Sequence, residues 1–176
     1  MGIEIEKKFL VRELPEDLDK YPCHIIEQGY LNVSPAIRVR REDSSFYMTY
    51  KGRKSEDGTI GQTEYNLPLD EESYLHLSAK ADGNIIRKKR YLIPLNDNAF
   101  DEADVAADEE LKKALTDGSI IIELDVFEAP FEGRVLAEVE FPSESAAAAY
   151  RMAEWFLEDV TGDCHYSNAY MSTEVL

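Results

Sequence analysis

Residues 4–11 read Glu-Ile-Glu-Lys-Lys-Phe-Leu-Val, and every second residue from Glu4 to Lys8 is charged. Alternate residues of a β-strand point to the same face of a sheet. Glu4, Glu6 and Lys8 therefore share one face, and Phe9 points to the opposite one. The stretch predicts a strand with one charged side and one apolar side.

The same charge spacing recurs in four further segments, where it is sorted by sign. The basic pairs are Arg38/Arg40 and Lys88/Arg90, and the acidic pairs are Glu123/Asp125 and Glu138/Glu140. The simple alternative is a solvated sheet face, but such a face tends to mix charges because neighbouring like charges destabilise each other. Arginine and lysine bind phosphate oxygens, and carboxylates bind hard divalent cations. Together the segments predict a cavity lined with both kinds of charge.

Period-two runs predict about eight strands along the chain. The expected strands cover residues 3–11, 25–32, 36–42, 45–51, 62–67, 84–93, 120–127 and 134–141. A short helix is expected over residues 70–81, with an apolar side formed by Tyr74, Leu75 and Leu77. A longer helix is expected over residues 143–160. The predicted fold class is mainly β with flanking helices (α+β).

Residues 96–118 interrupt this pattern with a dense group of acidic side chains. We expect a helix there that ends at Gly118, because glycine readily adopts the left-handed conformation that follows many helices. The residue spacing and the central glycine of a calcium-binding loop are missing. We interpret the segment as a solvated acidic insertion between two strands.

The chain has 176 residues, a length that favours a single domain spanning residues 1–176. Nineteen Lys and Arg residues against 36 Asp and Glu residues give a net charge of −17, which disfavours nucleic acid and membranes as partners. The charged start lacks the apolar core of a signal peptide, and no apolar run reaches the roughly 18 residues of a membrane span. We interpret Cys23 and Cys164 as free thiols and expect a cytoplasmic protein.

The run from Glu4 to Val11 resembles the ExExK signature of the triphosphate tunnel metalloenzymes, also called the CYTH domain superfamily. Further matches follow in order along nearly the whole chain, apart from the acidic insertion. They are Ile37-Arg38-Val39-Arg40, Tyr50-Lys51-Gly52, Glu64-Tyr65-Asn66-Leu67-Pro68, Lys88-Lys89-Arg90-Tyr91, Glu123-Leu124-Asp125-Val126-Phe127, Ala137-Glu138-Val139-Glu140-Phe141-Pro142, and Val160-Thr161-Gly162-Asp163 with Tyr166-Ser167-Asn168. In one departure, Gly61 and Gln62 replace the first two charged positions of the Arg-x-Glu-x-Glu run that the family often carries, and only Glu64 is left.

The resemblance implies an eight-stranded antiparallel closed barrel whose charged interior is a tunnel, with helices packed outside. The opening run resembles the compact bacterial branch of the family, in which inorganic triphosphatase activity is common. It therefore implies metal-dependent hydrolysis of inorganic tripolyphosphate to pyrophosphate and phosphate. The alternatives are a class IV adenylate cyclase, a thiamine or nucleoside triphosphatase, and a non-catalytic module that binds polyphosphate or a triphosphate.

Roles for the charged residues follow within this interpretation, and an all-oxygen site fits Mg²⁺ or Mn²⁺. The candidate metal ligands are Glu4, Glu6 and Glu140, then Glu138, with Glu123 and Asp125 as further candidates. The candidate substrate-binding residues are Lys8, Arg38, Arg40, Lys51, Glu64, Lys88 and Arg90. The candidate catalytic residues are Lys8, Glu6 and Glu140. Lys8 is expected to contact the terminal phosphate or to help orient the attacking water.

The six cations and seven carboxylates of this set total −1, and the rest of the chain holds −16. A cavity so close to neutrality does not favour a tetra-anionic chain by net charge. Two divalent cations would raise the cavity to +3, so metal is expected to be required for binding as well as for chemistry. The expected partner is a small-molecule triphosphate, and a homodimer is left open.

Other polar and aromatic residues are assigned ordinary roles. His24, His76 and His165 are interpreted as surface or packed histidines, Arg87 and Lys89 as solvated charges, and Arg53 and Lys54 as loop charges that could guard a tunnel mouth. Tyr150, Trp155 and Phe156 are expected to pack a helix on the barrel, with a nucleobase platform as the alternative.

Overall fold

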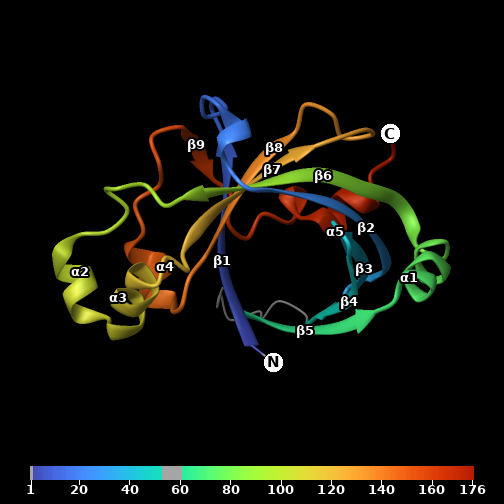
Figure 1. Ribbon diagram of the computed structural model, residues 1–176, viewed down its shortest axis with the longest axis horizontal. Coiled ribbons are helices and arrows are strands. Elements are labelled where there is room, and N and C mark those ends of the chain that lie inside the picture. Colours follow the sequence, from blue (N-terminus) through green and yellow to red (C-terminus); the bar gives the residue numbers. More distant parts are fainter. Residues whose placement is uncertain (1, 53–60) are drawn as a thin grey trace.

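The computed structural model describes residues 2–52 and 61–176, and its strands curl into a barrel with helices beside it (Figure 1). Arg53 and Lys54, predicted as loop charges, lie outside the described residues. The barrel strands are β1 (Gly2–Val11), β2 (Cys23–Val33), β3 (Ala36–Glu42), β4 (Ser45–Lys51), β5 (Gly61–Leu69), β6 (Asp82–Pro94), β7 (Ile121–Phe127) and β8 (Val135–Glu140). All eight predicted strands are confirmed.

The strands form one antiparallel sheet in the order β5-β4-β3-β2-β6-β7-β8-β1, and pairing of β5 with β1 closes it. Strand β1 is the seam of this barrel. Its residues Gly2–Ile5 pair with β5, and its residues Glu6–Leu10 pair with β8. A ninth strand, β9 (Phe156–Asp159), pairs with the end of β1 beyond the β5 contact. The predicted closed eight-stranded barrel is confirmed, and β9 is an addition to it.

The apolar sides of the charged strands face outward, onto a core covered by helices. Phe9 of β1 stacks on Phe156 with ring centroids 4.6 Å apart. Leu111 of α3 (Glu109–Thr116) and Ala146 of α4 (Glu144–Ala149) belong to the same buried cluster. Figure 1 shows these helices together on one side of the barrel. Because this face is buried, the charged rows on the other face line the inside of the barrel.

At one end of the barrel the inner rows become apolar. Ile86, Phe127 and Leu136 lie two residues along from Lys88, Asp125 and Glu138, on the same strand faces. These three apolar residues cluster with Met171 of α5 (Asn168–Ser172). Figure 1 shows α5 beside β6, within the outline of the barrel. The C-terminal segment therefore covers the apolar end of the inner wall.

Gly83, at the start of β6, allows this close approach. It has a positive φ of 70°, and a Cβ there would lie 2.1 Å from the carbonyl oxygen of Ser172. The neighbouring Asn84 donates a hydrogen bond from Nδ2 to the carbonyl oxygen of Glu174 at 2.8 Å. Only glycine combines the left-handed conformation with the absence of a side chain that this contact requires.

The predicted helix over residues 143–160 is wrong beyond its first turns. Ser143 caps α4 by accepting a hydrogen bond from the backbone N–H of Ala146, but the helix ends at Ala149 and the backbone becomes extended at Tyr150. The reason is tertiary: β9 pairs with the edge of β1 that β5 leaves free, and Phe156 reaches Phe9. This pairing overrides a helical pattern. Tyr150 and Phe156 are buried as predicted, although Phe156 packs from a strand.

The other two helical predictions are partly confirmed. Helix α1 (Glu71–Ser78) is capped by Asp70 and buries Tyr74, but Leu75 is 59% exposed, so its placement on the apolar side is wrong. Residues 96–118 form α2 (Glu102–Ala107) and α3, and Gly118 has a φ of 64° after the second. The segment is less solvated than expected, because α3 contributes buried residues to the outer core.

Two short 3₁₀ helices complete the structure, η1 (Leu18–Lys20) and η2 (Cys164–Tyr166). Among the described residues, no helix is long and apolar enough to cross a membrane. Cys23 and Cys164 are both unpaired and exposed.

Candidate active site

The predicted site residues lie along the inner wall of the barrel, many of them inaccessible to solvent. The buried members are Lys8, Arg38, Arg40, Lys88, Arg90, Asp125 and Glu138. The remaining members are more open: Glu4, Glu6, Lys51, Glu64, Glu123 and Glu140. Buried charges require close partners or a bound ligand, because desolvation of an unpaired charge is unfavourable. The partners therefore show which charges are already neutralised.

Arg90 lies at the centre of one ion-pair network. Its Nε donates to Oδ1 of Asp125 at 2.7 Å, and its Nη2 donates to Oε2 of Glu138 at 2.6 Å. Its Nη1 donates to Glu123. Asp125 also accepts from Lys88, which leaves both of its oxygens engaged. Burial opposes ionisation of Asp125, but Arg90 and Lys88 outweigh it and lower the pKa of this carboxyl.

Two lysines share carboxylate partners with Arg90, and their pKa values shift in opposite directions. Lys8 forms an ion pair with Glu138 at 2.8 Å, and the neighbouring carboxylates raise the pKa of Lys8 in spite of its burial. Burial and repulsion from Arg90 instead lower the pKa of Lys88 to about 8. Lys88 is therefore the cation of this network that loses its proton most easily.

Lys51 lies at the centre of a second network near the seam. It forms ion pairs with Glu4 and, at 3.0 Å, with Glu64. Burial, reinforced by Glu6 and only partly offset by Lys51, raises the pKa of Glu4 to about 7. Lys51 and Arg38 overcome the burial of Glu64 and lower its pKa. Of the two carboxyls that share Lys51, Glu4 is the one that is close to protonation at neutral pH.

Two pairs of glutamates lie directly opposite each other on neighbouring strands. Glu123 faces Glu138, and Arg90 bridges this pair. Glu6 faces Glu140, and among the described residues Glu140 has no ion pair. Burial and repulsion from Glu6 raise the pKa of Glu140. Nζ of Lys8 lies 4.0 Å from Oε1 of Glu6, but no cation among the described residues bridges the second pair as Arg90 bridges the first.

Two arginines of β3 have less carboxylate compensation than Arg90. Arg38 is 8% exposed, its Nε has no hydrogen-bond partner, and it forms no ion pair within the described part of the chain. Arg40 is held by Gln28 and Tyr47, and its nearest carboxylate, that of Glu42, is 3.6 Å from Nη1. A buried guanidinium with an unpartnered donor is suited to an anionic ligand.

The inner wall thus combines the unpartnered Nε of Arg38 with a carboxylate pair that no cation bridges among the described residues, the arrangement expected of a site for metal and phosphate. The family model of the CYTH domain matches residues 2–149. The chain belongs to the CYTH domain family. An inorganic triphosphatase of Nitrosomonas europaea is 31% identical over 176 residues, covering 98% of both chains. One from Acetivibrio thermocellus is 28% identical over 172 residues, covering 96% of this chain and 92% of the other.

A solved structure supports the same relationship. The crystal structure of the inorganic triphosphatase NE1496 superposes with a TM-score of 0.64 at 30% identity, covering 99% of this chain and 97% of that one. Similarity therefore extends through the C-terminal segment beyond the matched CYTH domain.

Sequence reasoning missed the polar residues that hold the site of this CYTH chain. Gln28 and Tyr47 contact Arg40, and Asn66 donates to Glu64 at 2.9 Å. All three lie on predicted strands, at positions whose side chains reach the inner wall. The available signal was strand parity: Gln28 shares a strand face with Ile26 and Tyr30, in a segment that carries no charge-x-charge pair.

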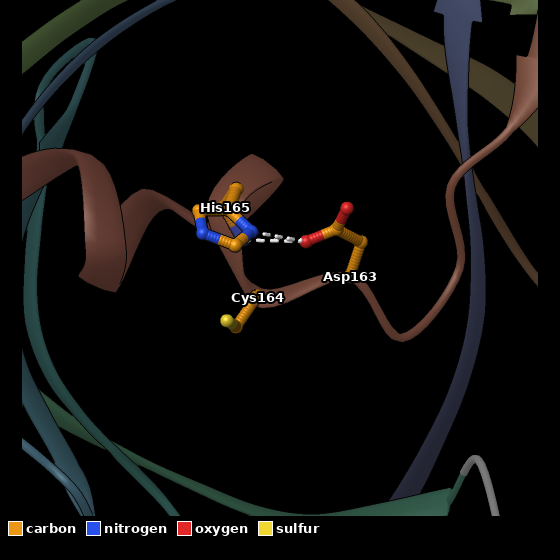
Figure 2. A group of neighbouring side chains, drawn as sticks. All are labelled: Asp163, Cys164 and His165. Atoms are coloured by element: carbon orange, nitrogen blue, oxygen red, sulfur yellow. Dashed lines mark hydrogen bonds and ion pairs between the residues drawn. The ribbon is translucent and has the colours of Figure 1, made fainter.

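A second group of ligand-type side chains lies in the C-terminal segment. Figure 2 shows Asp163, Cys164 and His165, whose ligand atoms lie within 4.8 Å of one another. All three are exposed, and Asp163 accepts hydrogen bonds from the backbone N–H and from Nδ1 of His165, at 3.0 and 2.7 Å. These bonds are those of a residue that caps η2, so the group is explained without a metal.

Proposed function

We propose that the protein hydrolyses inorganic tripolyphosphate to pyrophosphate and phosphate in a metal-dependent reaction inside the barrel. Two relatives that match nearly the whole chain are inorganic triphosphatases. The observation that carries the proposal is the buried Arg38, whose Nε has no partner. A phosphate oxygen supplies the acceptor that this donor lacks, whereas a neutral substrate would not compensate the charge.

The basic side chains divide into two groups in this proposal. Arg38 and Arg40, which are not tightly paired with carboxylates, bind the phosphate chain first. Lys8, Lys51, Lys88 and Arg90 already contact carboxylates and can contact phosphate from the positions that these partners fix. Positive groups held in place around a triphosphate stabilise the charge that develops in phosphoryl transfer.

Metal ligation is assigned to Glu4, Glu6 and Glu140. Glu138, the next candidate from the sequence, has its two oxygens engaged by Lys8 and Arg90, so we assign it to holding these cations. The Glu6/Glu140 pair fits a divalent metal ion, because Mg²⁺ and Mn²⁺ prefer oxygen ligands. Among the described residues, no cation bridges this pair. When bound, a divalent cation would offset the negative charge of the substrate and polarise its phosphoryl oxygens.

Asp125 and Glu123 have a different role in this proposal from the metal ligation expected from sequence. Asp125 is fully buried, and Arg90 and Lys88 occupy its two oxygens. Glu123 accepts from Arg90 as well. We assign both residues to holding Arg90 and Lys88 in place. Glu64 likewise orients Lys51, at 3.0 Å.

An organic triphosphate is a second candidate substrate, favoured by one feature of the structure. A cavity of about 540 Å³ lies where the C-terminal segment meets the apolar ends of β1 and β8, and its lining includes Leu10, Leu136, Tyr166 and Tyr170. Arg134, His165 and Glu174 complete the lining, and Leu10 and Leu136 lie two residues along from Lys8 and Glu138 on the same strand faces. Aromatic and aliphatic walls suit a base or another ring attached to a triphosphate.

One panel of assays tests both candidates. Purified protein is incubated with tripolyphosphate, ATP, GTP or thiamine triphosphate, each with Mg²⁺, with Mn²⁺ and with excess chelator, and released phosphate is measured. Hydrolysis of tripolyphosphate that requires metal supports the first candidate. Preference for an organic triphosphate supports the second, and full activity in chelator contradicts the metal requirement.

A further inference from the structure

Gln28 is a neutral side chain fully buried among the charges of the inner wall. It lies on β2, opposite Arg40 of β3 and Ile86 of β6 in the strand register. Its Oε1 accepts a hydrogen bond from Nε of Arg40 at 2.8 Å, and its Nε2 donates to the hydroxyl of Tyr30 at 3.3 Å. The amide is 0% exposed, so both of its polar ends depend on these contacts.

The contact between Gln28 and Arg40 resembles one made by Arg90 of β6, in which the acceptor is a carboxylate. Nε of Arg90 donates to Asp125 at 2.7 Å, the same kind of contact at the same guanidinium atom. Asp125 fixes Arg90 and also neutralises it, whereas the amide of Gln28 fixes Arg40 and leaves its charge in place. Burial and repulsion from Arg38 lower the pKa of Arg40, as expected where positive charge is uncompensated.

Tyr47 is a second neutral hydrogen-bond partner of the same guanidinium. Its hydroxyl accepts from Nη1 of Arg40 at 3.1 Å and donates to Oε2 of Glu42 at 2.5 Å. The carboxylate nearest to Arg40, that of Glu42, lies 3.6 Å from Nη1 and is hydrogen-bonded to the Tyr47 hydroxyl rather than directly to the guanidinium. Within the described residues, Nη2 of Arg40 has no protein partner and is left for a ligand.

We propose that Gln28 is a positioning residue that fixes the guanidinium of Arg40 for phosphate while preserving its full positive charge. This inference rests on the proposed function, in which Arg40 binds the phosphate chain. The neutrality of the amide is the property that matters, because a carboxylate in the same place would hold Arg40 equally well but would compete with the substrate. A non-polar side chain would leave the charge but release the guanidinium.

Two substitutions separate these two requirements. Gln28→Met removes the acceptor at nearly constant volume, and Gln28→Glu retains an acceptor but adds a charge. Dissociation constants for tripolyphosphate are measured by calorimetry with Mg²⁺ present, alongside kcat, KM and thermal unfolding. We expect Gln28→Met to raise Kd and KM about tenfold with a much smaller change in kcat. Gln28→Glu should raise both at least as far while its unfolding temperature stays at or above that of Gln28→Met.

A double-mutant cycle with Arg40 tests whether Gln28 acts through that residue. In an Arg40→Ala background, Gln28→Met should change Kd by less than about twofold, because no guanidinium remains to be positioned. Tyr150→Phe is the matched control, since it removes one hydrogen bond to Asn96, on the outer side of the barrel. It should lower stability without changing Kd.

The outcomes distinguish this inference from the proposed function. Wild-type-like Kd and KM in Gln28→Glu, or an undiminished effect of Gln28→Met without Arg40, would overturn the positioning role. If the protein binds tripolyphosphate without hydrolysing it, the proposed function fails, but the Kd values still decide the role of Gln28. Absence of binding by the wild type would overturn both.

Discussion

Glu6 of β1 and Glu140 of β8 lie directly opposite each other, and among the described residues Glu140 has no cationic partner. The equivalent pair of Glu123 and Glu138 is bridged by Arg90. Like charges in direct cross-strand contact destabilise a sheet. Lys8 lies 4.0 Å from Glu6 but does not bridge it to Glu140. The protein therefore leaves one pair unbridged where it bridges the other, and a bound cation is the physical reason that we propose for this difference.

Replacing Glu140 by Gln should have opposite effects with and without metal. Without metal, we expect Glu140→Gln to stabilise the fold by a few tenths to about 1 kcal/mol, because it removes the repulsion from Glu6. With Mg²⁺, the wild type should gain more stability than the variant, and turnover of the variant should be lost. Thermal unfolding with and without Mg²⁺ measures the two stability changes, and release of phosphate from tripolyphosphate measures turnover. Glu158→Gln, an exposed change on β9, is the control; equal metal stabilisation in Glu140→Gln and wild type would contradict the assignment.

Replacing Arg38 by Ala should weaken substrate binding with little loss of folding stability. The Nε of Arg38 has no hydrogen-bond partner to lose, so the main protein interaction removed is its attraction to Glu64, which Lys51 still pairs. A charge-assisted hydrogen bond contributes about 1.5–3 kcal/mol, so we expect KM for tripolyphosphate to rise roughly 10- to 100-fold. Arg40→Ala should behave similarly. Arg87→Ala, on the exposed outer side of β6, is the matched control; an unchanged KM in Arg38→Ala would place the phosphate elsewhere.

Metal binding should depend on pH through Glu4. Its pKa is raised to about 7, so below pH 7 a metal ion must displace a proton from this carboxyl, and above pH 7 it need not. We expect the apparent metal affinity to fall as the pH drops below 7, by up to about tenfold per pH unit, and to level off above it. Calorimetry in buffers of different ionisation enthalpy measures the proton released. Glu4→Gln should abolish most of this release, whereas identical affinity at pH 6 and pH 8 would contradict it.

Replacing Gly83 by Ala should detach the C-terminal segment. The new Cβ would lie 2.1 Å from the carbonyl oxygen of Ser172, and the residue would also be strained at a φ of 70°. Gly133→Ala is a matched control, since Gly133 has a φ of 90° but no atom within 4 Å of its Cβ position. Left-handed strain alone costs about 1 kcal/mol. We expect Gly83→Ala to lose clearly more than Gly133→Ala in denaturant unfolding; equal losses would mean that the contact with Ser172 adds nothing.

The strands and the sidedness of their charges could be predicted because a period of two links sequence directly to a strand face. Glu4, Glu6 and Lys8 needed no knowledge of the partner strand to be placed together. The residues around 150–159 could not be predicted this way. Their apolar spacing suits a helix, and only the free edge of β1 and the ring of Phe9 select a strand instead.

The ion-pair and hydrogen-bond partners of each charged side chain could not be predicted from the sequence either. Asp125 was expected to ligate metal by residue type alone, but the register opposite Arg90 gives both of its oxygens to protein donors. Gln28 was not singled out because it is neutral, and its contact with Arg40 depends on the register between β2 and β3. Residue type gave the chemistry of the cavity, and register decides which charges remain available for ligands.

The kcat/KM of purified protein for tripolyphosphate, compared with that for ATP under Mg²⁺ and again in excess chelator, decides whether this barrel is a metal-dependent triphosphatase. The charged inner wall predicts a value for tripolyphosphate at least roughly tenfold above that for ATP, a difference of about 1.4 kcal/mol, and no turnover in chelator. ATP preferred over tripolyphosphate, with cyclic AMP among the products, or turnover that persists in chelator, would contradict the account.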